Sequence, residues 1–227
     1  HLKDYPDSMH YRYDNVITLR TFSKAHGLAG FRVGYGFAHN YLIENLDRVK
    51  HKIKSVVSSS VDSTRRLQSA GFIVEELSTV GKPDLYIDGA DEVTHHLHMI
   101  KGGGGALTRE KIIANASQKI ICIAHSAKLV DILGKFPLPI EVIPMAKSLV
   151  ARELAILGGQ AEIRHDFITD NGNIILDVHN LKILNPPDLE KKINNIAGVV
   201  TNGIFSLRSA DLLIIGKDQE IEKYNKE

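Results

Sequence analysis

The sequence predicts an α/β fold: a Rossmann-like, mostly parallel sheet with a second, smaller ferredoxin-like α+β domain. Short apolar runs alternate with helix-periodic segments through the middle of the chain, which is typical of a parallel sheet with right-handed crossovers. Pro137-Leu138-Pro139 then interrupts this alternation. The segments after it follow the order β-α-β-β-α-β, which indicates a ferredoxin-like domain.

Length and composition bound the function. The 227 residues carry a net charge of +1 and are 43% hydrophobic. This suits one or two domains with a real core and offers no argument for nucleic-acid or membrane partners. No apolar run approaches the roughly 20 residues of a membrane span. The single cysteine, Cys122, lies in an apolar run and is expected to be a buried strand residue. With no visible signal peptide, it favours a reducing cytoplasm.

The larger domain is predicted to comprise residues 51–136 and 207–227. Its strands are expected at residues 53–58, 72–74, 85–87, 120–124 and 212–215, and its helices at 61–70 and 108–117. Apolar runs predict the strands, and Ser60 or Asp62 would cap the first helix. An earlier strand is expected at residues 15–21. The last residues are charged, so we expect them to be frayed.

The smaller domain is predicted to comprise residues 137–206. Its strands are expected at residues 140–143, 160–164, 174–178 and 199–205, and its helices at 145–157 and 187–195. Asp170-Asn171-Gly172-Asn173 is a strong hairpin-turn signal between two of these strands. Pro186-Pro187 suits the beginning of the second helix.

The functional signal is concentrated in residues 84–110. Asp88, Asp91 and Glu92 follow an apolar run at a predicted strand end. Ligands of open α/β sheets bind at the carboxyl ends of strands. Asp-Gly after a strand is often only a turn, so this feature alone leaves a structural interpretation open.

The glycines that follow complete this signal. Lys101 precedes four glycines, and Glu110 lies in the first turns of the next predicted helix. Glycines let backbone N–H groups approach an anion, and the helix N-terminus adds partial positive charge. A glycine run is often only flexible, and an early glutamate often only complements the helix dipole. Acids, a cation and an anion cradle within one short span together favour a functional site.

These motifs resemble the type A ribose-5-phosphate isomerases. The similar stretches are IDGADE, KGGGGALTREK and SAKLVDILGKFPLPIEVIP, with VSSS, TDNGNIILD and ADLLIIG also fitting, from about His51 to the end. The resemblance implies interconversion of ribose 5-phosphate and ribulose 5-phosphate through an enediolate, in the pentose phosphate pathway. It implies no cofactor, a sugar-phosphate substrate and a homo-oligomer, either a dimer or a tetramer.

The resemblance also implies roles for particular residues. Glu110 is expected to be the general base, with Asp88 and Lys101 also catalytic. Substrate binding is expected from Asp88, Gly89, Ala90, Asp91, Lys101, Gly102, Gly103, Gly104 and Lys128. By itself, Lys128 could also be a solvated lysine at a helix start. His95, His96 and His98 cluster in a predicted exposed turn, and we expect no metal site there.

The first 50 residues resemble a different family. TFSKAHGLAGFRVGYG is similar to the cofactor-lysine segment of fold-type I aminotransferases, most of all the histidinol-phosphate aminotransferases. That resemblance implies a pyridoxal phosphate Schiff base at Lys24, with Thr21, Ser23 and Arg32 around the cofactor phosphate. It stops near Lys50 and lacks the remaining cofactor-binding segments. A complete aminotransferase is therefore not expected, although cofactor binding through Lys24 and an inactive hybrid both stay open.

The isomerase-like part lacks its usual beginning. Counted back from VSSS, the phosphate-binding Thr-Gly-Ser-Thr loop of that family falls on residues 35–38, where only Gly36 matches. Binding energy from a remote phosphate helps to position the reacting carbons. We therefore expect impaired isomerase activity. As a hypothesis, residues 31–36 would replace the missing strand and residues 41–46 the following helix.

Overall fold

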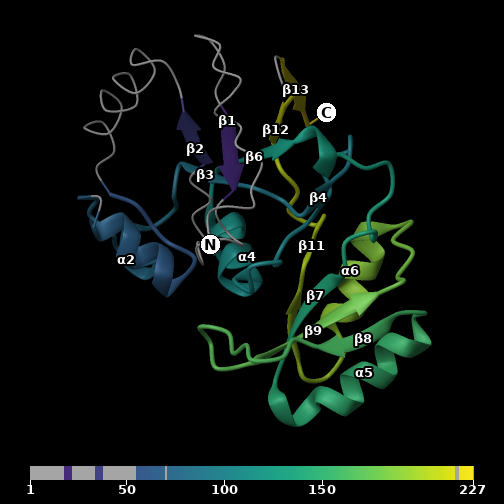
Figure 1. Ribbon diagram of the computed structural model, residues 1–227. Coiled ribbons are helices and arrows are strands. Elements are labelled where there is room, and N and C mark those ends of the chain that lie inside the picture. Colours follow the sequence, from purple (N-terminus) through teal and green to yellow (C-terminus); the bar gives the residue numbers. More distant parts are fainter. Residues whose placement is uncertain (1–17, 22–33, 38–54, 70, 218–219, 227) are drawn as a thin grey trace, which may run out of the picture.

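The computed structural model describes residues 18–21, 34–37, 55–69, 71–217 and 220–226 (Figure 1). Figure 1 shows two groups of elements, with β7, β8, β9, α5 and α6 at one end and β3, β6, β12 and β13 at the other. Two separate hydrophobic clusters underlie these groups. Within the described residues, no helix is both long enough and apolar enough to cross a membrane.

The main sheet has the strand order β13-β12-β6-β3. Strands β3 (Leu85–Asp88), β6 (Lys119–His125) and β12 (Leu212–Gly216) are parallel, and β13 (Ile221–Asn225) pairs antiparallel with β12. Alternate strand residues are buried on one face, where the helix α4 (Leu107–Ala116) contributes to the same core. This core includes Tyr86, Ile113, Ala114, Ile120, Cys122, Ala124, Leu213 and Ile215.

A separate, small antiparallel sheet has three strands. It consists of β4 (Glu92–Val93), β5 (Met99–Ile100) and β11 (Ile204–Phe205), in the order β11-β5-β4. All six residues are buried. Because β11 belongs to the segment that returns from the smaller domain, this sheet ties the two parts of the molecule together (Figure 1). It also presents Lys101, the residue that follows β5.

The smaller domain has the ferredoxin-like arrangement predicted from the sequence. Its elements are β7 (Leu138–Val142), η3 (Pro144–Ala146), α5 (Lys147–Ile156), β8 (Gln160–Ile163), β9 (Ile174–His179), α6 (Pro186–Asn194) and β10 (Val199–Asn202). The sheet order is β10-β7-β9-β8, with all pairs antiparallel. Asn185 caps α6 by accepting a hydrogen bond from the Asp188 N–H, and two prolines begin this helix.

Several elements differ from the sequence-based predictions. The strands expected at 53–58 and 72–74 contribute a single parallel bridge, Val56 to Val74, among their described residues. The helices α2 (Val61–Ser69) and α3 (Leu77–Val80) flank the second of these segments, and α3 was not predicted. The expected strand 199–205 is divided at Gly203, where a side chain would meet the Lys101 carbonyl oxygen at 2.3 Å. The β4–β5 hairpin was also not predicted, because each strand has only two residues.

The prediction that the C-terminal end is frayed is wrong for residues 221–225. These residues form β13, and their pairing with β12 runs from Ile221 opposite Gly216 to Asn225 opposite Leu212. The charged residues Glu222 and Lys223 hid the strand, because an edge strand can carry charge without losing its backbone hydrogen bonds.

The N-terminal part contributes a two-stranded antiparallel sheet. Its strands are β1 (Thr18–Thr21) and β2 (Gly34–Phe37). The prediction of a strand at 15–21 therefore holds for residues 18–21. Residues 34–36 do form a strand, but it pairs with β1 in a sheet separate from the main one. The helix proposed at 41–46 lies outside the described residues.

Candidate active site

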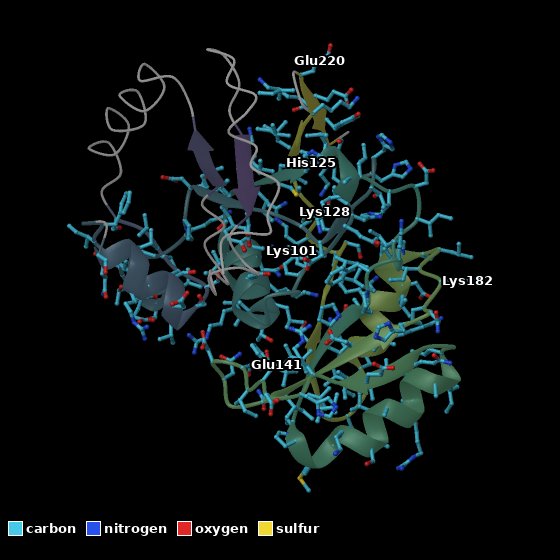
Figure 2. All side chains as sticks on the ribbon, viewed as in Figure 1. Lys101, His125, Lys128, Glu141, Lys182 and Glu220 are labelled. Carbon is cyan, nitrogen blue, oxygen red and sulfur yellow. The ribbon has the colours of Figure 1, made fainter. Side chains whose placement is uncertain are left out.

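Lys101 lies at the centre of the candidate site (Figure 2). Its backbone N–H donates to the Gly203 carbonyl at 2.9 Å, which fixes the residue at the end of β5. Its ammonium nitrogen Nζ donates to Asp88 Oδ2 and to the Gly89 carbonyl, both at 2.7 Å, and lies 3.2 Å from Glu110 Oε2. Lys101 is only 1% exposed. A buried ammonium requires such partners, because burying it unpaired would be costly.

Asp88 ends β3 with its side chain on the buried face. Its Oδ2 also accepts from the Tyr86 hydroxyl at 2.6 Å, and its Oδ1 accepts from the Gly89 N–H at 2.7 Å. Tyr86 shares this face because side chains two residues apart lie on the same side of a strand. These bonds fix the carboxylate in one orientation beside the Lys101 ammonium.

Glu110 approaches the same ammonium from α4. Its N–H donates to the Ala106 carbonyl at 2.9 Å, so Glu110 lies in the first turn of hydrogen-bonded helix. The residue is 3% exposed. Asp88 and Glu110, 22 residues apart in the sequence, thus reach the same nitrogen from a strand end and a helix beginning.

The glycine loop lies against Asp91. The Gly103 N–H donates to Asp91 Oδ2 at 2.7 Å, and the Asp91 N–H donates to the Ile100 carbonyl at 2.8 Å. A side chain at Gly103 would lie 2.7 Å from Asp91 Oδ1, so this contact requires glycine. Gly102 has a φ of 107°, a conformation that other residues rarely adopt.

The remaining predicted binding residues surround this core. Gly89 and Ala90 are buried, and Gly104 is half-buried. Lys128 ends the 3₁₀ turn η2 (Ser126–Lys128) after β6, and its Nζ lies 5.8 Å from the centre of the Phe136 ring. Figure 2 labels Lys128 and Lys101. The residue after Lys128, Leu129, forms a parallel bridge with Val93 of β4, two positions after Asp91.

The third carboxylate of the strand-end cluster has a structural role. Glu92 accepts hydrogen bonds from the Gly134 N–H at 2.8 Å and the Phe136 N–H at 2.6 Å. It therefore fixes the loop that carries the chain toward the smaller domain. Sequence proximity to Asp91 suggested a shared site, but the Glu92 carboxylate, at the start of β4, pairs with the Gly134 and Phe136 N–H groups instead.

Some of the residues singled out in the sequence lie away from the site or outside the described residues. His95 packs edge-on against the Tyr224 ring at 5.2 Å, and His96 lies 6.5 Å from His98. Burial lowers the pKa of His98, and the nearby His96 lowers it further. Among the described residues, no cluster of His, Cys, Asp or Glu could hold a metal ion. Ser23, Lys24 and Arg32 lie outside the described residues.

Sequence reasoning missed three contributors to the site. Tyr86 could have been found from its i, i+2 spacing to Asp88. Phe205 packs 5.6 Å below the Lys101 ammonium, and the Arg164 guanidinium reaches the carbonyls of the glycine loop. Both come from segments about 60 to 100 positions away, and no local pattern marks them.

The arrangement can carry out proton transfer. A buried carboxylate beside a fixed ammonium can take a proton from carbon while the ammonium and loop N–H groups stabilise the resulting oxyanion. The same cluster offers carboxylate acceptors for hydroxyl groups.

Two family models match the chain. Ribose 5-phosphate isomerase A (phosphoriboisomerase A) matches residues 55–220, and aminotransferase class I and II matches residues 8–73. The chain is 58% identical to ribose-5-phosphate isomerase A of Francisella tularensis subsp. novicida over 190 residues, which are 83% of this chain and 85% of that protein.

Solved structures agree with this similarity. The ribose 5-phosphate isomerase A of Neisseria gonorrhoeae is 48% identical, with a TM-score of 0.78 over 82% of this chain and 84% of that one. The enzyme from Methanocaldococcus jannaschii is 36% identical, with a TM-score of 0.75 over 82% and 85%.

Proposed function

The chain belongs to the ribose 5-phosphate isomerase A family, and we propose that Glu110, Lys101 and Asp88 carry out its isomerisation of ribose 5-phosphate and ribulose 5-phosphate. The enzyme is an aldose–ketose isomerase of the pentose phosphate pathway. The observation that supports the residue assignment is the convergence of both carboxylates on the buried Lys101 ammonium, at 2.7 and 3.2 Å.

In the proposed mechanism, Glu110 removes the proton from C2 of open-chain ribose 5-phosphate. The electrons move into the C1 carbonyl, whose oxygen becomes the oxyanion of an enediolate. Glu110 then returns the proton to C1 while the O2 hydroxyl loses its proton and O1 gains one, which gives ribulose 5-phosphate. A positioned base contributes about 10²–10⁴-fold in rate.

The oxyanion needs positive partners. Lys101 holds its ammonium between Asp88 and Glu110. In the proposed mechanism, the ammonium therefore does not have to move when negative charge develops on the substrate oxygen. Asp88 and Asp91 would bind sugar hydroxyls and assist ring opening, with Lys128 and the N–H groups of residues 102–104 as further substrate contacts. Because electrons are only redistributed within the sugar, the step needs no redox cofactor.

The N-terminal sequence affects the expected efficiency. Only Gly36 matches the phosphate-binding loop of the family, and it lies in β2, which pairs with β1. Phosphate binding normally helps to hold the reacting carbons in place. We therefore propose turnover below that of a relative with an intact loop.

The deciding experiment is the conversion of ribose 5-phosphate by the purified chain and by Glu110→Gln. The amide keeps the shape of the side chain but cannot accept the carbon-bound proton, so kcat should fall by about 10²–10⁴-fold. Glu153→Gln is the matched control, because Glu153 is exposed on α5. Full activity of Glu110→Gln would remove Glu110 from the role of base.

Assembly and location extend this proposal. We propose a homo-oligomer, supported by apolar side chains that are exposed around α5, among them Met145 and Ile156. Light scattering after size-exclusion chromatography would measure the mass directly, and a monomer would contradict the assembly. The buried thiol of Cys122 is compatible with a reducing cytoplasm.

A second candidate activity rests on the aminotransferase match over residues 8–73, which includes Lys24. If Lys24 binds pyridoxal phosphate, incubation with the cofactor produces near-ultraviolet to blue absorbance that borohydride bleaches. We expect Lys24→Ala to abolish that absorbance if it is specific. An unchanged spectrum in the unmodified chain would dismiss this activity.

A further inference from the structure

Arg164 joins the smaller domain to the glycine loop of the candidate site. It follows β8, and its N–H donates to the Ile175 carbonyl at 2.9 Å, which extends the β8–β9 ladder. Its guanidinium nitrogen Nη1 donates to the carbonyl oxygens of both Gly102 and Gly103 at 3.3 Å. The first contact fixes Arg164 to the β8–β9 sheet, and the other two connect it to the glycine loop of the larger domain.

Asp177 holds the guanidinium in the required orientation. It lies on β9 and accepts from Arg164 Nε at 2.8 Å and also from Nη2. This two-point pairing leaves Nη1 directed at the loop. The Phe167 ring, 5.5 Å from the guanidinium carbon, packs on the same side chain. Arg164 is therefore fixed before it reaches the glycine loop.

The contact helps to determine which way two peptide groups face, together with the Gly105 N–H, which donates to the Gly102 carbonyl at 2.8 Å. In a planar trans peptide, the C=O and the following N–H point in opposite directions. With the Gly102 and Gly103 carbonyls directed at Arg164, the N–H groups of Gly103 and Gly104 must face away from it. The Gly103 N–H does so and donates to Asp91 Oδ2 at 2.7 Å. By the same argument, the Gly104 N–H also points away from Arg164.

A run of four glycines needs this restraint. Glycine reaches conformations with positive and negative φ almost equally, so its peptide groups reorient easily. Fixing each such residue in one conformation therefore has an entropic cost. A flipped 102–103 peptide would present a carbonyl, not an N–H, to Asp91 and to the substrate side.

We propose that Arg164, held by Asp177, is a positioning residue that keeps the Gly103 N–H on Asp91 and orients the Gly104 N–H toward the developing oxyanion. This inference rests on the proposed isomerase function. Arg164 touches no reacting atom and acts only through the loop. The smaller domain would thereby contribute to catalysis and not only to the stability of the fold.

The test is chemical rescue of Arg164→Ala. Losing the orientation of the loop should lower kcat by about 10²-fold, because a displacement of about 1 Å in a catalytic group has an effect of that size. KM should stay near the unsubstituted value. Guanidinium ion at millimolar, non-denaturing concentration should restore part of kcat, because it can occupy the position beside Asp177. Arg152→Ala is the control, since Arg152 is exposed on α5.

Two further measurements make the result specific. The double variant Arg164→Ala/Asp177→Asn should not be rescued, because the anchor for guanidinium is gone. If Arg164→Ala does not fold, Arg164→Lys replaces it and should also lose kcat, because an ammonium lacks the fork that pairs with Asp177 while reaching both carbonyls. Unchanged kcat, or a folded Arg164→Ala that guanidinium does not restore, would overturn the inference.

Failure of this inference can be told apart from failure of the proposed function. An active chain that loses activity in Glu110→Gln but not in Arg164→Ala contradicts only the role of Arg164. If the unsubstituted chain is inactive, hydrogen exchange of the peptide covering residues 102–105 decides instead. Exchange should be faster in Arg164→Ala than in Arg152→Ala, and equal rates would overturn the inference.

Discussion

Asp211 joins the beginnings of two parallel strands through its side chain. Its Oδ2 accepts from the Ile120 N–H at 2.7 Å, and its two oxygens accept from Arg208 at 2.9 and 2.7 Å. The hydrogen bonds from Arg208 hold the pKa of Asp211 below its ordinary value of 3.8, with a further contribution from Ile120, although partial burial acts in the opposite direction.

This arrangement predicts a pH-dependent effect of Asp211→Asn. A carboxyl with a depressed pKa in the folded state stabilises the fold above its unfolded pKa, and this stability is lost as pH falls through the folded pKa. At neutral pH the variant should be less stable by about 1.5 kcal/mol. Urea denaturation at a series of pH values would measure the difference in the free energy of unfolding between the two chains. This difference should shrink as the pH falls below 3.8. A constant difference would contradict the prediction.

Residue identities in the site could be predicted where one short segment carries them. Asp88, Asp91, Lys101 and Glu110 lie within 23 positions, and a strand end followed by a glycine run marks them. Glu92 shared that pattern and nevertheless serves a different loop. Arg164 gave no signal, because its function depends on a contact between domains that only the folded chain creates.

At the scale of elements, the hairpin loop between β8 and β9 is organised by a carboxylate from β7. Glu141 is fully buried, and Figure 2 labels it. It accepts from the Thr169 hydroxyl at 2.9 Å, the Asn173 amide at 2.8 Å and the Asn171 amide at 3.1 Å. The Thr108 hydroxyl of α4 also donates to it.

We expect Glu141→Gln to loosen this loop. Two of the donors are amides, so a glutamine NH₂ group would face donors and leave at least one buried group unsatisfied, at a cost of about 1–3 kcal/mol. Thermal unfolding should occur at lower temperature, and exchange in residues 169–173 should be faster. Glu162→Gln is the matched control, because Glu162 is exposed on β8. Unchanged stability would mean that the loop holds its shape without the carboxylate.

Elements were predictable where they were long or bordered by clear signals. The apolar runs of β6 and β12 and the proline start of α6 agreed with expectation. The two-residue strands β4 and β5 are too short to show a period, and their pairing depends on β11 more than 100 positions later. Such elements exist only because tertiary contacts complete their hydrogen bonds.

At the scale of the whole molecule, the main sheet has two unlike faces. One face packs with α4 in the core. The other carries an apolar row across three parallel strands, made up of Leu85, Ile87, Ile121, Ile123, Leu212 and Ile214. Leu85 and Ile87 remain 45% and 48% exposed. Parallel sheets are normally covered on both faces, so this row requires a cover.

Residues 1–54 precede the segment that matches the isomerase family, and they could cover this face of the sheet. We therefore expect a chain beginning at Ser55 to bind more of a hydrophobic dye and to aggregate more readily than the full chain. Completing the burial of two half-exposed aliphatic side chains contributes about 2 kcal/mol, so the full chain should also unfold at higher temperature. β3 lies at the edge of the main sheet as described, and an uncovered edge adds to the tendency to aggregate.

Dye fluorescence, light scattering and a circular dichroism melt would measure dye binding, aggregation and the unfolding temperature of the full chain and of the chain beginning at Ser55. Ile87→Lys provides a second test, because a charge on a covered face lowers the melting temperature of the full chain, whereas on an open face it only improves solubility. If the shortened chain stays monodisperse and melts as cooperatively as the full chain, residues 1–54 do not cover the sheet. The aminotransferase-like segment would then be an appendage, and the isomerase core would fold with one face of its parallel sheet open to solvent.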